Sequence, residues 1–169
     1  MTWRLDGTLP PNRCVAAETH NDGQAFATMD RFLDKGSYGP SWMRKPEIAR
    51  AVVIALNHHQ DNLGHYRLHA YVVMPNHVHL LITPLVAPPA ILQLLKGFTA
   101  RDANLMLDRT GLPFWQRESY AHWLREGEFD RISRYIEMNP VKAGLASEPH
   151  LYPWSSASRW PAGLPAPLS

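Results

Sequence analysis

The amino-acid sequence predicts an α+β fold, because strand-like and helix-like segments follow one another in the order βαββαβ, with one more helix after them. Apolar residues recur at helical spacing in long stretches, and a Pro75-Asn76 turn separates two runs of alternating apolar residues. This order is that of the ferredoxin-like sandwich. The length of 169 residues suits one domain over residues 1–169, in which we expect 155–169 to form an irregular tail.

The first part of the chain supplies a strand and two helices. Thr2–Leu5 is expected to be a short strand, which Gly7 and two following prolines end. Pro46 suits the first turn of a helix, and the apolar face that follows it predicts a helix over Pro46–Asn62. A smaller helix before it is indicated by apolar residues at helical spacing, namely Phe26, Met29, Phe32 and Leu33.

The middle of the chain predicts a β-hairpin and a long helix. Leu68–Met74 and His77–Thr83 have strand-like patterns, and the Pro75-Asn76 turn joins them. A long amphipathic helix follows Pro88 and Pro89 and extends to Leu105, with an interruption at Gly97.

The last part of the chain supplies a strand and a helix. Phe114–Leu124 is extended and aromatic-rich, which predicts the fourth strand. The last helix should begin near Glu128 and end near Asn139, because Pro140 disfavours helix at the residue before it. In the tail, we expect Tyr152 and Trp154 to anchor the chain.

Composition limits the function classes. A net charge of +2 and an isoelectric point near 8.8 permit nucleic-acid binding without demanding it. Cys14 is the only cysteine, which excludes an intramolecular disulfide and a cysteine-based zinc site and favours a reducing compartment. The segment Met1–Arg13 lacks the apolar core of a signal peptide, and no apolar stretch approaches a membrane span. We therefore expect a cytoplasmic protein.

A histidine pair is the first candidate for chemistry. His77 and His79 are two residues apart on a predicted strand, so both imidazoles should point to one face. Imidazole is a common metal ligand, and two such ligands leave coordination positions for water and substrate. The alternative is two half-buried histidines that only cap a sheet face. His58 and His59 should instead face different ways, as a surface residue and a core-edge residue.

A tyrosine and an asparagine form the second candidate. Tyr135 and Asn139 are four residues apart near the end of the last predicted helix, so they share one face. A phenol can act as a covalent nucleophile toward a phosphodiester when a metal offsets the phosphate charge. The alternative is a tyrosine packed at the core edge with Asn139 as a helix cap.

Three sequence blocks resemble one known family. Residues 74–81 read Met-Pro-Asn-His-Val-His-Leu-Leu, residues 114–120 read Phe-Trp-Gln-Arg-Glu-Ser-Tyr, and residues 134–145 read Arg-Tyr-Ile-Glu-Met-Asn-Pro-Val-Lys-Ala-Gly-Leu. In this order they resemble the REP-associated tyrosine transposases, which belong to the single-tyrosine HUH endonucleases. The hydrophobic residue of the HUH motif is Val78 here. The resemblance covers nearly the whole chain.

The resemblance implies a metal-dependent endonuclease and strand transferase that acts on single-stranded DNA at hairpin-forming REP-like repeats. It implies that His77, His79 and Asn139 bind Mg²⁺ or Mn²⁺ and that Tyr135 attacks the phosphate, which leaves a 5′-phosphotyrosine and a free 3′-OH. His122 is the rival third ligand and Tyr120 the rival nucleophile. The partner would be single-stranded or hairpin DNA. The protein would bind it as a nucleoid-associated monomer or homodimer.

Several residues are expected to contact DNA. Trp115 and Trp123 are candidates for stacking on unpaired bases, with burial as the alternative. Basic residues near the site are candidates for phosphate contacts, namely Lys96, Arg101, Arg117, Arg125, Arg131, Arg134 and Lys142.

The sequence departs from the family pattern in two places. Ala121 stands where relatives often carry an acidic residue, and the first strand begins within its motif at Met1, which suggests a shortened start. A relative that binds hairpin DNA and no longer cuts it is therefore an alternative function. A metal-dependent hydrolase unrelated to DNA, built on the histidine pair, is a third.

Overall fold

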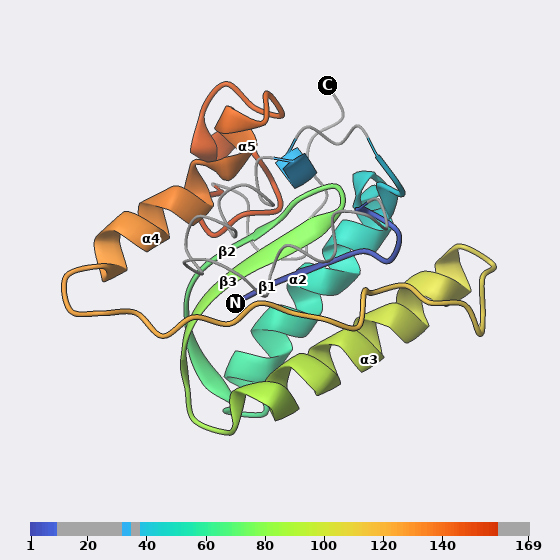
Figure 1. Ribbon diagram of the computed structural model, residues 1–169, viewed down its shortest axis with the longest axis horizontal. Coiled ribbons are helices and arrows are strands. Elements are labelled where there is room, and N and C mark those ends of the chain that lie inside the picture. Colours follow the sequence, from blue (N-terminus) through green and yellow to red (C-terminus); the bar gives the residue numbers. More distant parts are fainter. Residues whose placement is uncertain (10–31, 35–37, 159–169) are drawn as a thin grey trace.

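A three-stranded antiparallel sheet forms the centre of the computed structural model, which describes residues 1–9, 32–34 and 38–158 (Figure 1). Strand β3 (His77–Pro84) lies between β1 (Thr2–Arg4) and β2 (Tyr66–Val73). The β2–β3 pair is the predicted hairpin around Pro75-Asn76, and its pairing shifts once, between Leu68 and Ala70. The short strand predicted at the start of the chain is confirmed as β1.

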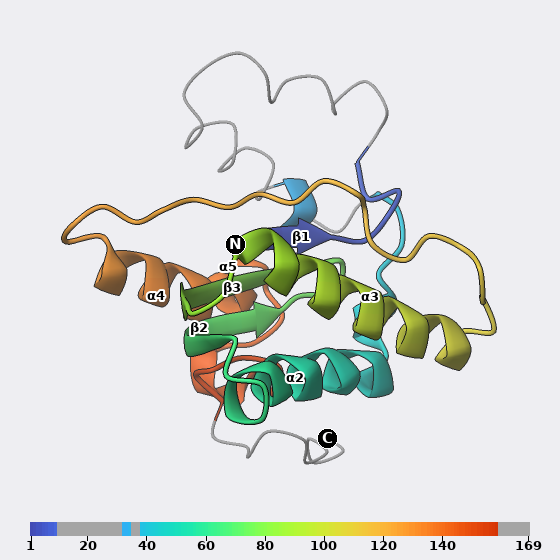
Figure 2. The ribbon, with the colours of Figure 1, turned by 90° about the horizontal axis from the view of Figure 1, so that it is seen from below.

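Two long helices pack on one side of the sheet. Figures 1 and 2 show α2 (Pro46–Asp61) and α3 (Pro88–Met106) side by side there. Pro46 lies in the first turn of α2, as predicted, whereas Pro88 and Pro89, expected before the long helix, form the first turn of α3. A 3-10 turn, η2 (Trp42–Arg44), precedes α2. The core between the helices and the sheet is formed by apolar side chains, among them Ile48, Val52, Leu56, Val78, Leu80, Ile91 and Leu95.

The other side of the sheet carries the last helices. Helix α4 (Phe129–Glu137) packs against β2 and β3, and the short α5 (Asn139–Lys142) follows it directly. Pro140 lies in the first turn of α5, where its missing N–H costs no helical hydrogen bond. The predicted end of the helix before Pro140 is thus confirmed, and the backbone then resumes a helical turn.

The fourth strand predicted over Phe114–Leu124 is only partly formed, so the α+β class holds while a regular four-stranded sheet is wrong for the described residues. The segment runs beside β1 and meets it in two isolated bridges, Leu5–Trp115 and Thr2–Tyr120. These bridges are three residues apart on one chain segment and five apart on the other, so a continuous ladder cannot connect them.

The segment after α5 closes the outer edge of β2. A 3-10 turn, η3 (Pro149–Leu151), leads into it; Trp154 then accepts a backbone hydrogen bond from Val73, and Ser155 bridges Val72. Tyr152 and Trp154 are both buried, as their predicted anchoring role requires. At the start of the expected tail, Ser155 is still paired with the sheet; residues 159–169 lie outside the described part.

Of the small helix predicted between residues 26 and 33, Phe26 and Met29 lie outside the described residues. Phe32–Asp34 form a helical turn in which Leu33 is buried. Within the described ranges, no helix combines the length and the apolar character that crossing a membrane requires.

Candidate active site

The predicted histidine pair lies on the sheet face that α4 covers. His77 and His79 alternate with Val78 on β3, so their rings share one face, and both are buried. Their Nε2 atoms are 3.1 Å apart and their ring centroids 4.7 Å apart. Two imidazole nitrogens therefore converge on one point in the protein interior.

Neighbouring residues fix the tautomer of His77. The Nδ2 of Asn76 donates to the carbonyl of Leu33 at 2.9 Å, so the amide Oδ1 of Asn76 faces the Nδ1 of His77, at 2.7 Å. That Nδ1 must donate, because an amide oxygen only accepts. In the neutral ring the Nε2 of His77 is then unprotonated, and its lone pair points toward His79.

The ring of His79 is held from the neighbouring strand. The Oγ1 of Thr2 on β1 lies 2.8 Å from the Nδ1 of His79, because these residues are direct partners in the strand pairing. When a hydroxyl or carbonyl holds one ring nitrogen, the other is oriented for a ligand. Both histidines have this arrangement, and both direct Nε2 at the same place.

A carboxylate also lies beside the pair. The Oδ1 of Asp34 is 3.7 Å from the Nε2 of His77, and the side chain of Asp34 is mostly buried. Over the part of the chain that the structure describes, no three His, Cys, Asp or Glu side chains form a metal cluster.

Tyr135 on α4 reaches the histidine pair from above the sheet. Its ring centroid lies 6.1 Å from that of His79 in an edge-on arrangement. The ammonium of Lys142, on α5, lies 4.3 Å from the centroid of the Tyr135 ring. The half-buried phenol thus has an imidazole on one side and a cation on the other.

Asn139 lies one helical turn beyond Tyr135 and is completely buried. Neither its Oδ1 nor its Nδ2 has a hydrogen-bond partner among the described residues. A buried amide without partners costs about 1–3 kcal/mol, so it calls for an explanation such as a catalytic role or a bound water or ion.

Comparison with known proteins places this site in a family. The model of the IS200-like transposases matches residues 47–139, which include both histidines, Tyr135 and Asn139. The chain belongs to the IS200-like transposase family. A comparison of this family member with curated proteins returned no match.

A solved structure shares the fold of the IS200-like chain. It is described as the REP-associated tyrosine transposase bound to a REP hairpin, and it superposes with a TM-score of 0.56 at 16% sequence identity. The match covers 99% of this chain and 84% of the other. At this level of identity the likeness shows the fold, and the family model independently supports the resemblance drawn from the sequence blocks.

The rival residues of the IS200-like chain, His122 and Tyr120, lie on the segment that runs beside β1. The ring of His122 is exposed, stacks on Tyr120, and its Nε2 lies 3.7 Å from a carboxylate oxygen of Glu128. Tyr120 pairs through its backbone with Thr2. Ala121, between them, is exposed and lines a small pocket next to His122.

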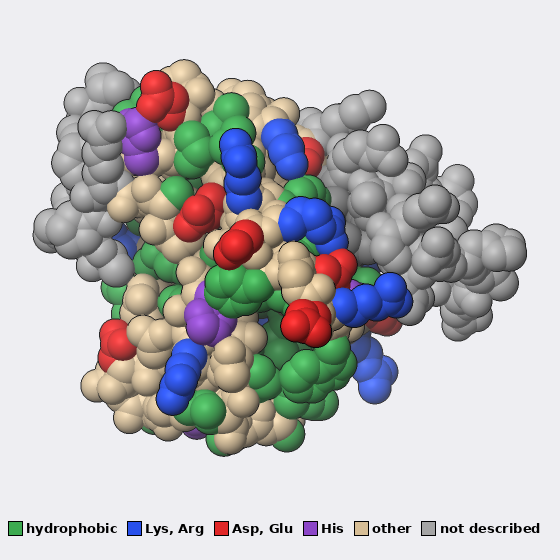
Figure 3. All heavy atoms as spheres, turned by 90° about the vertical axis from the view of Figure 1, so that its left-hand side faces the viewer, with side chains coloured by type: hydrophobic (Ala, Val, Ile, Leu, Met, Phe, Trp, Pro, Cys, Tyr) green, Lys and Arg blue, Asp and Glu red, His purple; other side chains and the backbone are tan. Residues whose placement is uncertain are grey.

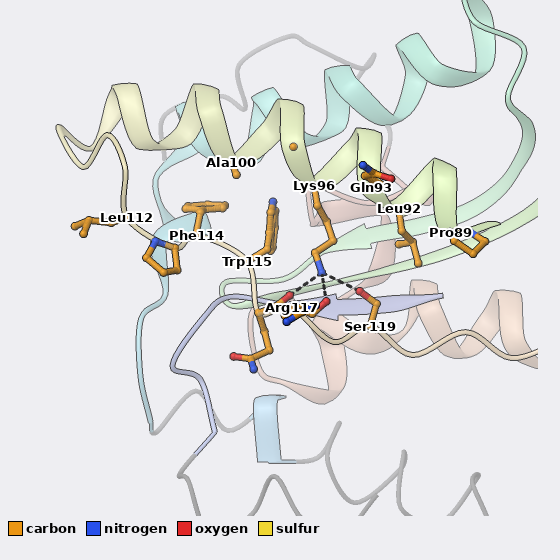
Figure 4. Close-up of a pocket in the computed structure, with 13 residues that line it drawn as sticks. Pro89, Leu92, Gln93, Lys96, Ala100, Leu112, Phe114, Trp115, Arg117 and Ser119 are labelled. Carbon is orange, nitrogen blue, oxygen red and sulfur yellow. Dashed lines mark hydrogen bonds between the residues drawn. The ribbon is translucent and has the colours of Figure 1, made fainter. Parts of the chain in front are cut away.

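Lys96, one of the predicted DNA contacts, lies within the fold. Its ammonium donates to the carbonyls of Gln116 and Arg117 at 2.6 and 2.9 Å and to the hydroxyl of Ser119 at 3.0 Å (Figure 4). Burial lowers the pKa of Lys96, which the charge of Glu118 partly offsets. These bonds turn the two carbonyls toward α3, which explains why the segment does not pair regularly with β1.

The other predicted phosphate contacts of the IS200-like chain are exposed. Figure 3 shows the side of the molecule that carries α4, where basic and acidic side chains are interleaved. Arg131 pairs there with Glu128 at 2.7 Å. The remaining exposed basic residues are Arg101, Arg117, Arg125, Arg134 and Lys142.

The two candidate stacking tryptophans, which the sequence could not distinguish, differ in burial. Trp115 is 7% exposed and donates through Nε1 to the hydroxyl of Thr99 at 2.9 Å, so burial holds for it. Trp123 is 73% exposed. His59 is buried against His65 and Tyr66 while His58 is exposed, as expected for residues that face different ways.

Sequence reasoning missed three residues that shape the site: Thr2, Asn76 and Asp34. Asn76 had a local signal, because it adjoins His77 in the tight turn. Thr2 and Asp34 are 77 and 43 residues from their histidine partners, and no spacing rule connects them.

Proposed function

We propose that this protein is a metal-dependent endonuclease and strand transferase that cuts single-stranded DNA at hairpin-forming repeats, with Tyr135 as the nucleophile. The observation that carries the proposal is the contact between the Tyr135 ring and His79 of the converging histidine pair. Family membership supports a DNA-processing reaction of the transposase type. The similar structure is bound to a REP hairpin, which supports REP-like hairpin DNA as the partner of this chain, as monomer or homodimer.

The residues present fit a divalent cation. His77 and His79 offer Nε2 atoms that are 3.1 Å apart, close to the roughly 3.0 Å expected for adjacent ligands of one octahedral ion. The buried Oδ1 of Asn139 would be the third protein ligand, in line with its lack of a described hydrogen-bond partner. When bound, Mg²⁺ or Mn²⁺ would offset the negative charge of the phosphate and polarise its oxygens.

The chain's own side chains would carry the covalent step. The Oη of Tyr135 forms a bond to phosphorus while the bond from phosphorus to the 3′-oxygen breaks. The phenol gives up its proton and the leaving 3′-oxygen takes one up, so the products are a 5′-phosphotyrosine and a free 3′-OH. Lys142, over the Tyr135 ring, would favour the negative charge that develops on the phenol oxygen. Attack by another 3′-OH reverses these bonds and joins the strands.

An adduct assay tests the proposal. The protein is incubated with Mn²⁺ and a labelled pool of single-stranded DNA that carries hairpins with unpaired flanks, and covalent adducts are separated under denaturing conditions. We expect wild type and Tyr120→Phe to form an adduct and Tyr135→Phe to form none. An adduct that disappears only with Tyr120→Phe would contradict the assignment, as would the absence of any wild-type adduct. The alternative of a binding protein that no longer cuts predicts hairpin binding without an adduct.

A further inference from the structure

A groove separate from the histidine site lies on the α3 side of residues 112–119, in the segment that runs beside β1. This groove of about 610 Å³ separates α3 from residues 112–119 (Figure 4). This volume is within the range of small-ligand sites, about 300–1,000 Å³. The lining is mixed: Gln93, Lys96 and Arg117 lie toward one end together with the apolar Pro89 and Leu92, and Ala100, Leu112 and Phe114 lie toward the other.

Gly97 forms part of the helical wall of this groove. Glycine is unfavourable inside a helix, so a helix-interior glycine usually has a conformational or packing reason. Gly97 has neither within the described structure: it is in α3, no left-handed φ is recorded for it, and a Cβ at this position would meet no described atom within 4 Å. Gly97 is exposed, and the groove lies beside it. A glycine there lets a ligand approach the helix closely.

The charges around the polar end favour an anion. The ammonium of Lys96 enters the groove, the guanidinium of Arg117 is exposed at its rim, and Arg4 is close enough to lower the pKa of Lys96. Glu118 is the acidic residue among these cations, and the amide of Gln116 already donates to it. Lys96 and Arg117 are the charged residues among those that line the groove, and both are positive.

We propose that this groove binds an unpaired segment of the DNA strand, with a phosphate near Lys96 and Arg117 and the attached base beside Ala100 and Leu112. The proposal rests on the proposed function, since it names where the substrate is held outside the reacting centre. A groove with this mixed lining matches a nucleotide, which has a charged phosphate at one end and an apolar base face at the other.

Residues of the segment beside β1 link the groove to the histidine site. Ser119 lines the groove, and Tyr120, the next residue, exchanges two backbone hydrogen bonds with Thr2. The hydroxyl of Thr2 contacts His79. The groove and the proposed reacting centre are thus linked through Ser119, Tyr120 and Thr2.

The test fills the groove without disturbing the fold. Gly97→Gln places a good helix former where the structure is open, so its Tm should equal or exceed that of wild type. Leu105→Gln is the matched control, because Leu105 is exposed on the same helix and lies outside the groove. Binding of a labelled single-stranded oligonucleotide is measured by fluorescence anisotropy in EDTA, where no cleavage occurs. We expect Gly97→Gln to raise the Kd about tenfold and Leu105→Gln to leave it unchanged.

Arg117→Gln tests the polar end, and we expect it to weaken binding and to reduce the dependence of the Kd on salt. Three results would overturn the proposal: no binding by wild type, Gly97→Gln within about twofold of wild type, or equal weakening for a blunt hairpin without unpaired nucleotides. This outcome is independent of the Tyr135 adduct, which is measured with Mn²⁺. The groove proposal can therefore fail while the proposed chemistry stands, and the reverse.

Discussion

Replacing Asn139 with leucine should make the metal-free protein more stable. Asn139 is completely buried, and its two polar side-chain atoms lack hydrogen-bond partners in the described structure. Removing a buried unpaired amide and substituting an apolar side chain of similar volume should gain about 1–3 kcal/mol in the free energy of unfolding. For a protein of this size that gain corresponds to a rise in Tm of about 2–12 °C.

The measurement is thermal unfolding of wild type and Asn139→Leu, each in EDTA and in Mn²⁺. Wild type should gain stability from Mn²⁺, because a cation that binds only the folded state stabilises it. Asn139→Leu should start higher in EDTA, gain less from Mn²⁺ and form no covalent DNA adduct. If Asn139→Leu unfolds below wild type in EDTA by more than about 1 kcal/mol, the amide has a structural role and the reasoning is refuted.

Three further predictions concern stability. Lys96→Met should lower the free energy of unfolding in urea by about 1–2 kcal/mol, because two backbone carbonyls lose their donor. Tyr152→Phe should cost about 1 kcal/mol by the same measurement, since the phenol donates to the carbonyl of Val73 at 2.9 Å. Burial lowers the pKa of His59, with His65 and His58 adding to the effect, so the folded protein binds fewer protons there than the unfolded chain. Stability should therefore fall as the pH drops below about 6.5, and His59→Asn should flatten that fall.

Controls separate these effects from general destabilisation. Lys45→Met changes an exposed lysine and should leave the unfolding midpoint in urea unchanged. A loss equal to that of Lys96→Met would show that charge, rather than the three hydrogen bonds, matters. For the pH series, a wild-type curve that is flat between about pH 7.5 and about pH 5.5 would contradict the His59 assignment.

Periodicity predicted the elements whose stability comes from local pattern and burial. Helix α2 and the β2–β3 hairpin were found close to their observed bounds, because an apolar stripe and a proline turn are properties of contiguous residues. The segment from Phe114 to Leu124 has a strand-like pattern as well. Its pairing depends on Lys96, which draws two carbonyls toward α3, and such a contact is absent from local pattern.

The candidate site was only partly visible in the sequence. The two-residue spacing of His77 and His79 was enough to place both rings on one face, and that expectation is confirmed. The metal-binding and nucleophilic roles of these residues and of Tyr135 and Asn139 stay predictions. Asp34 could not be found, because only the folded chain brings it to His77.

The orientation of one histidine depends on strand register. Side chains alternate between the two faces of a strand, so the hydroxyl of Thr2 meets His79 only while these residues are paired. A slip of β1 by one residue would place Trp3 opposite His79 and turn the Thr2 hydroxyl to the other face. Tyr120 holds Thr2 by two backbone hydrogen bonds from the opposite side and thereby opposes such a slip. The orientation of the His79 ring is thus set by the alignment of a three-residue strand, which the backbone of Tyr120 holds in place.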